Sequence, residues 1–350
     1  MVGHRLCVAI GMAGVVWLGN WTGLARAQTT TTEAASVLVF PRVVVTGSWD
    51  TIIQIGNNAN RPANARCYYA NGTIWAPTNF SLAFHQQQPT HWVASRGRAL
   101  DPNDQECGVT NNDCDGAGFD PGAIPALDAP FAGELRCIEV DASGAPWTGN
   151  ALSGVATLMH RTSGEIVKYP AVGLHGLETN DADTSLCLGG DPRVGCLHGA
   201  EYAGCPKSWI VSHPADFDDR SFDGDARSTS ITVVPCSEDF GAAMQMPLLL
   251  QFRLTNEFEE TFSAATTITC WADLHLSDIS TVFQRDTIGS NWLQTTVRAA
   301  GDNSSGFILT QQSTRETAFL ATFAAAGTVP PHETEPLGSD IVGLPEEVGQ

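Results

Sequence analysis

Short runs of β-branched and aromatic residues, separated by turn-forming residues, dominate the hydrophobic pattern of the chain from residue 37 onward. Runs of this composition are typical of β-strands. The segment 248–254 alternates apolar and polar residues at its C-terminal end, which indicates a strand with one buried face. No long segment has the amphipathic period of a helix. The expected strands are 37–40, 43–45, 51–55, 66–69, 81–84, 91–95, 134–141, 154–160, 165–169, 209–212, 230–234, 248–255, 266–274, 292–298 and 307–310.

Two local signals refine this pattern near the start. Pro41 interrupts the apolar run 37–45, and because proline cannot donate a backbone hydrogen bond, it indicates an edge strand or a strand that switches sheets. Asn71-Gly72 follows another apolar run and is a strong hairpin signal.

Many short strands with Gly, Pro and Asn turns predict an all-β protein, built as two tandem antiparallel β-sandwiches of immunoglobulin-like type with disulfide-stapled loops. Strand signals lapse into Gly, Asn and Asp between residues 170 and 185, so we place the boundary there. The expected parts are a signal peptide (1–27), a linker (28–36), a first sandwich (37–175), a second sandwich (176–326) and a disordered tail (327–350).

The first 27 residues have the pattern of a secretory signal peptide. Arg5 gives a basic start, the apolar run 6–19 follows, and Ala25-Arg26-Ala27 forms a small-x-small cleavage site. A short membrane anchor is the alternative, but helix-breaking residues follow the apolar run at once. We therefore expect an exported protein that is extracellular, bound to the cell surface or periplasmic.

The chain is strongly acidic, with 18 Lys and Arg against 38 Asp and Glu, a formal charge of −20. Removal of residues 1–27 takes away Arg5 and Arg26, which leaves 16 basic residues and a charge of −22. This charge repels phosphates and argues against nucleic acid as a partner. No apolar run of about 20 residues follows the signal, so we expect no integral membrane span in the mature chain.

Nine cysteines remain after cleavage, and export makes disulfides the default interpretation. An odd number leaves at least one thiol free or paired with another chain. Cys67 and Cys137 lie in expected strands of the first half, so a bridge between two sheets is plausible. The favoured pairs are Cys67–Cys137, Cys107–Cys114, Cys187–Cys196, and either Cys205–Cys236 or Cys236–Cys270.

Several stretches of sequence are similar to one known family. The run FPRVVVTGSWDTIIQIGN and the following CYYANG resemble the start of a family of uncharacterised exported bacterial proteins with no assigned activity. The matching pieces further on are QQPTHWVASRGR, GAGFDPGAIP, GELRCIEVD, VVPCSEDF and LTNEFEETFS. The resemblance runs from about residue 37 to about residue 275. It implies export and a β-rich fold, and it carries no catalytic residue.

The segment 111–120 is the best candidate for a metal site. Asn111, Asp113 and Asp115 alternate as oxygen donors before a glycine, as in the first half of a calcium-binding loop, and Asp120 adds a carboxylate. The final Glu of such a loop is absent, because that position is Gly122. The alternative is a solvated turn stapled by a Cys107–Cys114 disulfide. The sequence therefore establishes no cofactor, and calcium is its one candidate.

Two further acidic loops, 180–183 and 216–225, are alternatively calcium ligands or plain solvated loops, and Arg220 and Arg227 could neutralise the second. No metal-spaced His pair, nucleophile elbow, phosphate loop or dinucleotide fingerprint occurs. The seven mature tryptophans fit core packing better than sugar stacking, which remains open.

We therefore favour an exported non-catalytic β-sandwich protein with a surface, structural or binding role. The alternatives are a calcium-supported carbohydrate-binding module and a secreted hydrolase with paired carboxylates. An enzyme is the less favoured interpretation, and the partner, a glycan or a protein, is open.

Overall fold

The computed structural model describes residues 29–100, 120–177, 183–190, 192, 195–218, 225–241, 247–301, 306–317 and 341–344. Within these residues the fold is almost entirely antiparallel β-structure, which confirms the expected all-β class. The helical elements are short: α1 (Leu276–Ile279), the 3-10 turn η1 (Thr281–Phe283) and α2 (Arg285–Ile288). None of the helices in this part of the chain is long and apolar enough to cross a bilayer.

The first half of the chain forms two sheets. Sheet 1 has the order β1 (Thr29–Thr30), β10 (Val172–Leu174), β2 (Val37–Val45), β7 (Phe131–Val140), β4 (Ala63–Asn71) and β5 (Pro77–Phe84). Sheet 2 has the order β6 (Pro89–Val93), β3 (Trp49–Asn57), β8 (Leu152–His160) and β9 (Ile166–Pro170). The side chains between the two sheets form the first hydrophobic core.

The second half forms two more sheets. In sheet 3, β13 (Asp225–Pro235) pairs on one edge with β12 (Phe217–Asp218) and β16 (Ala272–His275), and on the other with β18 (Phe307–Thr317). Sheet 4 has the order β15 (Thr261–Ile268), β14 (Leu248–Asn256), β17 (Trp292–Ala300), β11 (Ser208–Pro214) and β19 (Ile341–Leu344). The second core lies between sheets 3 and 4.

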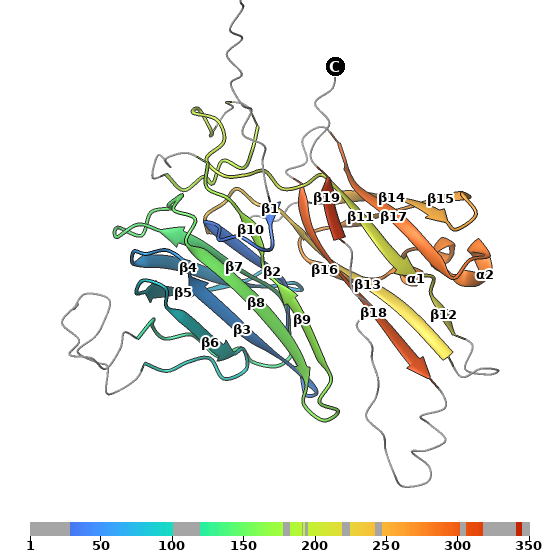
Figure 1. Cartoon of the computed structure of the whole chain (residues 1–350), viewed down its shortest axis with the longest axis horizontal. Helices are drawn as coiled ribbons and strands as arrows, with labels where there is room; N and C mark the ends of the chain where they lie inside the picture. The colour runs from blue at the N-terminus through green and yellow to red at the C-terminus, as the bar shows by residue number, and fades with distance from the viewer. Residues whose placement is uncertain are drawn as a thin grey trace, which may run out of the picture.

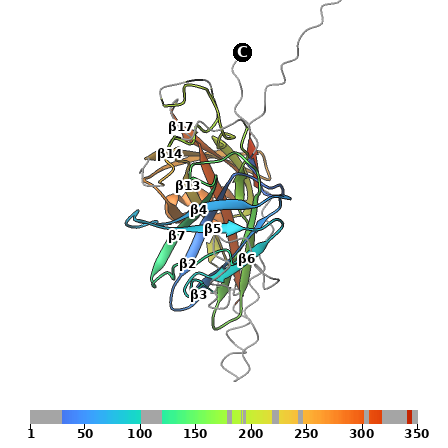
Figure 2. The same ribbon diagram turned by 90° about the vertical axis from the view of Figure 1, so that its left-hand side faces the viewer.

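A third core joins the two halves, and we call it the seam. Sheet 1 contributes Val37, Val39, Tyr68, Ile138, Val172 and Leu174, and the second half contributes Leu186, Leu188, Tyr202, Cys205, Val234, Cys236 and Ile308. The seam therefore covers part of the outer faces of sheets 1 and 3 and packs the two halves against each other. Figure 1 shows the blue-to-green strands of the first half side by side with the yellow-to-red strands of the second, and in Figure 2 the first half lies in front of the second.

Strand β2 corrects the interpretation of Pro41. The strand lies inside sheet 1, between β10 and β7, and is not an edge strand. Its register with β7 shifts between Phe40 and Val43, so Pro41 falls in a bulge where no ladder hydrogen bond is required. The apolar run 37–40 is continuous because the first core covers one face of the strand and the seam covers the other.

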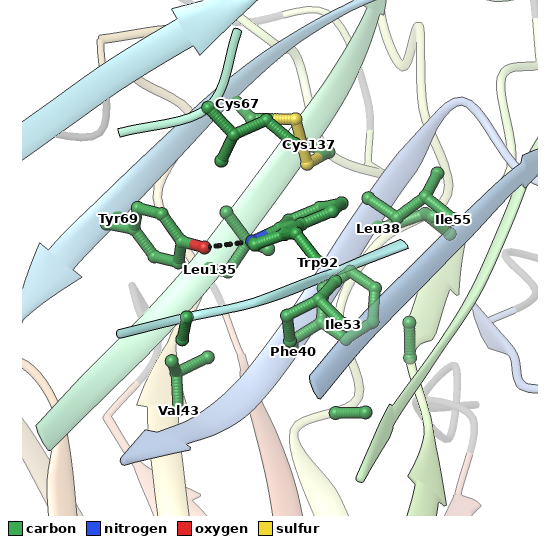
Figure 3. Close-up of a cluster of buried hydrophobic side chains, with 14 of the residues drawn as sticks. Leu38, Phe40, Val43, Ile53, Ile55, Cys67, Tyr69, Trp92, Leu135 and Cys137 are labelled. Carbon is green, nitrogen blue, oxygen red and sulfur yellow. Dashed lines mark hydrogen bonds between the residues drawn. A yellow bond between two sulfur atoms is a disulfide. The ribbon is translucent and has the colours of Figure 1, made fainter. Parts of the chain in front are cut away.

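The first core contains a buried polar pair and a disulfide (Figure 3). The indole Nε1–H of Trp92 on β6 donates to the hydroxyl of Tyr69 on β4 at 2.6 Å. Burial raises the pKa of that hydroxyl well above its ordinary value. Cys67 and Cys137 lie directly opposite each other on β4 and β7, so their disulfide joins neighbouring strands of one sheet. The predicted cysteine pair is therefore confirmed, but the expectation that it joins two sheets is wrong.

The structure describes residues in the expected linker, in the expected tail and at the expected boundary between the two sandwiches. In the segment expected as a linker, β1 pairs with β10. In the segment expected as a disordered tail, β19 pairs with β11. The boundary expected after residue 175 follows β10, and the segment between β10 and β11 contributes side chains to the seam. The signal peptide lies outside the described residues, and the immunoglobulin-like topology stays a prediction.

Candidate functional site

Most of the predicted calcium loop lies outside the described residues, including Asn111, Asp113, Asp115, Cys107 and Cys114. Asp120 is described and buried. Its Oδ1 accepts hydrogen bonds from Arg98 at 2.7 Å and from the backbone N–H of Gly122 at 2.8 Å. This carboxylate already has a cationic partner inside the protein, and the calcium site stays a prediction.

In the other acidic loops, the described carboxylates accept hydrogen bonds from backbone N–H groups. The carboxylate of Asp183 accepts from the N–H of Ser185 at 2.6 Å. The two oxygens of Asp216 accept from the N–H groups of Thr229 and Ser277, at 2.8 and 3.2 Å. Burial raises the pKa of Asp216 to about 6, although these hydrogen bonds oppose the rise. Asp219, Asp223 and Arg220 lie outside the described residues, and Arg227 lies over the ring of Phe217.

Two other buried carboxylates each contact an arginine. Asp50 accepts from Arg161 and from the hydroxyl of Ser95, both at 2.6 Å. Glu139 accepts from Arg61 at 2.6 Å and from the backbone N–H of Ala151 at 3.0 Å. The described chain contains no group of three His, Cys, Asp or Glu side chains that could hold a metal ion.

Three disulfides lie in the described residues, and each joins a pair favoured from the sequence. They are Cys67–Cys137, Cys187–Cys196 and Cys205–Cys236. Of the two alternatives for Cys236, the structure has the bond to Cys205, and Cys270 is a free buried thiol. Disulfides are rare in cytosolic proteins, so these bonds indicate an extracytoplasmic protein.

An unusual polar cluster lies in the seam. Glu134 and Arg136, both on β7, are buried at 3% and 5% exposure, on the face of sheet 1 that meets the second half. With Trp75 they line a cavity of about 20 Å³. Within the described chain, three side-chain atoms here have no hydrogen-bond partner: Trp75 Nε1, Glu134 Oε2 and Arg136 Nε. The other guanidinium nitrogens of Arg136 donate to the carbonyls of Ser237 and Asp239.

Burial controls the protonation of this cluster. It raises the pKa of Glu134 to about 7, and the positive charge of Arg136 opposes the rise. Burial also raises the pKa of the nearby Cys270 thiol, and the charge of Glu134 adds to that effect. Perturbed pKa values often mark functional sites. The seam cavity, however, accommodates about one water molecule and no organic substrate.

His213 is the other strongly perturbed group. It is 1% exposed, and its two ring nitrogens lie 2.9 Å from the carbonyl oxygen of Pro214 and 2.8 Å from the hydroxyl of Thr295. Burial lowers its pKa to about 4, so the ring is neutral at physiological pH. Both ring nitrogens are occupied by structural contacts, which leaves neither for acid–base work.

The outward face of sheet 4 has a different character, and we call it the open face. It is formed by Gln251 and Arg253 on β14, Ser263 and Ala265 on β15, and Thr296 and Arg298 on β17. These residues, with Thr261, line a surface groove of about 700 Å³. Sequence reasoning missed this face, although the alternation in 248–254 already predicts that Gln251 and Arg253 point away from the core.

Comparison with known proteins gives little further guidance. No family model and no curated protein matches the chain. One solved structure with some similarity is the PBSX exported protein XepA, at 10% identity and a TM-score of 0.18, covering 90% of this chain and 100% of that one. Another is a putative secreted protein from Parabacteroides distasonis, at 11% identity and a TM-score of 0.17, covering 83% and 90%. TM-scores this low do not establish a shared fold.

Proposed function

We propose that this protein is an exported, non-catalytic binding protein. Two sandwiches, packed through the seam, present sheet 4 to a partner outside the cytoplasm. The three disulfides support export, to the cell surface, the medium or a periplasm. The described fold offers sheet faces and edges rather than an enclosed catalytic cleft.

The observation that carries the proposal is how the buried acids are engaged. Asp50, Asp120 and Glu139 are each paired with an arginine, and Asp216 is bound by backbone N–H groups. Among the buried acids of the described chain, only Glu134 has an oxygen without a hydrogen-bond partner, and it lines a cavity too small for a sugar. A hydrolase needs two carboxyl groups that converge on one substrate. The described acids favour structural roles instead.

The calcium-supported carbohydrate-binding module remains the second candidate. An exposed tryptophan, Trp292, lies beside the open face at 39% exposure and could stack on a sugar ring. The calcium requirement rests on loop 111–120, most of which lies outside the described residues.

The test measures binding and cleavage on the same samples. The full chain without its signal is incubated with soluble polysaccharides, with and without EDTA, while retention and release of new reducing ends are recorded. We expect retention on at least one polysaccharide and no release of reducing ends. Release that disappears when one acidic residue is changed to its amide would overturn the proposal. Loss of retention in EDTA alone would favour the calcium-supported candidate.

A further inference from the structure

The open face combines positive charge with hydrogen-bonding side chains in a strongly acidic protein. Arg253 lies opposite Thr296 on β17 and Ser263 on β15. Arg298 lies opposite Gln251 on β14 and Ser208 on β11. The two arginines are therefore diagonal neighbours, with Cα atoms about 7–8 Å apart. Both side chains lie on the same side of the sheet, so one anionic chain can contact both guanidinium groups.

Neither arginine of the open face has an ion pair in the described residues. Five other arginines do: Arg42 with Asp273, Arg61 with Glu139, Arg98 with Asp120, Arg161 with Asp50 and Arg285 with Asp286. The chain has 38 acidic residues against 18 basic ones, so acidic partners are abundant. The described strands β14, β15 and β17 nevertheless contain no Asp or Glu. Charge complementarity therefore favours an anionic ligand for this face.

The remaining groups on and beside the face suit a sugar chain. Gln251, Ser263 and Thr296 offer amide and hydroxyl groups for sugar hydroxyls. Trp292, Gln294, Thr296 and Arg298 follow one another along the same side of β17. From Trp292 to Arg298 this row extends about 20 Å, long enough for several sugar rings.

Other anionic partners fit less well. Nucleic acid is favoured less, because its affinity depends on neutralising many closely spaced phosphates and the open face offers two arginines. A stable protein interface generally has an apolar centre. Here the exposed large apolar side chains of β14 and β17, Leu249 and Trp292, lie at opposite ends of sheet 4, with polar residues between them.

We propose that the open face binds an anionic polysaccharide, with Arg253 and Arg298 each contacting a carboxylate or sulfate group of the chain. This inference rests on the proposed binding function and names its ligand class. Bidentate hydrogen bonding makes arginine well suited to both anions. The hydroxyl and amide side chains between the arginines then contact the sugar rings.

The test compares matched arginine substitutions in the full chain without its signal. Binding to polygalacturonate, dextran sulfate and neutral dextran is measured by calorimetry at low and high NaCl concentration. Arg253→Gln and Arg298→Gln each remove one charge from the open face. Arg96→Gln removes one exposed charge from the first sandwich and serves as the control.

We expect each open-face variant to weaken binding to an anionic polysaccharide about ten-fold, the usual effect of losing one charged hydrogen bond. The control should change binding less than two-fold, and salt should weaken binding. Preference for polygalacturonate identifies a carboxylate ligand, and preference for dextran sulfate identifies a sulfate ligand.

Three results would overturn the inference: equal binding to neutral dextran, no binding to either anionic polysaccharide, or equal losses in the control and the open-face variants. Tighter binding to poly-L-glutamate than to either anionic polysaccharide would also overturn it, in favour of an acidic protein. Cleavage of the polysaccharide would instead contradict the proposed function, so the two failures are distinguishable.

Discussion

At the scale of single residues, the seam shows how one alternating pattern has two structural meanings. In the segment 134–137, Glu134 and Arg136 alternate with Leu135 and Cys137, which predicts a strand with one face in water. The apolar pair does enter the first core. The polar pair meets a second sheet, because another part of the chain covers that face. Local periodicity reports which side chains share a face, and carries no information on what covers it.

Glu134 should make the stability of the protein depend on pH. Its pKa rises from 4.5 to about 7 in the folded state, so the folded protein binds this proton more tightly than the unfolded chain. The associated stability is present below pH 4.5 and is lost as the pH rises through 7. Glu134→Gln should therefore match the wild type near pH 4.5 and exceed it by about 3 kcal/mol at pH 8. Thermal melts between these values measure the difference.

Asp128→Asn is the control for that series, because Asp128 is exposed. It should leave the pH dependence of the melting temperature unchanged. An Arg136 contact that keeps Glu134 ionised in the fold would instead make Glu134→Gln less stable at pH 8, contrary to this prediction. The lowered pKa of His213 reduces the free energy of unfolding as the pH falls below 6.5. This effect is the same in the wild type and in Glu134→Gln, so it cancels in their difference.

Cys270 combines a buried thiol with a backbone conformation that favours glycine, since its φ is 113°. Cys270→Ala loses the packing of the sulfur and keeps the strained backbone. Cys270→Gly loses slightly more packing but relieves strain of about 1–3 kcal/mol. We expect the glycine variant to be at least as stable as the alanine variant in urea unfolding. A glycine variant that is clearly less stable than the alanine variant would show that the backbone is not strained there.

At the scale of elements, the hydrophobic pattern predicts where strands occur better than it predicts which strands pair with each other. The alternation in 248–254 correctly indicates the buried and exposed faces of β14. Pro41 indicated an edge strand or a strand that switches sheets, and the edge alternative is wrong, because a bulge and a second covering layer are not local properties. The candidate site shows the same limit. The alternation in 248–254 predicts that Arg253 points outward, but its proximity to Arg298 depends on the register of β14 with β17.

Strands β4 and β7 pack closely at one glycine. A Cβ atom added at Gly133 would lie 2.0 Å from the carbonyl oxygen of Ala70. Gly133→Ala should therefore destabilise the protein by about 2–3 kcal/mol, since the strands must separate. Gly47→Ala is the matched control, because nothing lies within 4 Å of its added Cβ atom. Chemical unfolding of both variants measures the contrast, and equal costs would contradict the expected close packing.

At the scale of the whole molecule, the seam should couple the unfolding of the two sandwiches. Ile138 is fully buried in the seam, and Ile53 is fully buried in the first core. Each Ile→Ala substitution should cost about 2–5 kcal/mol. We expect one calorimetric transition for the wild type and for Ile53→Ala. Ile138→Ala weakens the contact between the sandwiches and should broaden or split the transition. Two transitions already in the wild type would contradict the coupling.

The pairing of β19 with β11 makes a short segment near the C-terminus part of sheet 4. Without these residues, β11 becomes the edge of the sheet and presents a row of unpaired backbone N–H and C=O groups. Such an edge accepts a strand from another molecule. Proteolytic trimming ahead of residue 341 would thus convert a closed edge into an acceptor for strand donation. A trimmed copy has itself lost this strand, so the strand that completes its sheet must come from an untrimmed copy or from another protein.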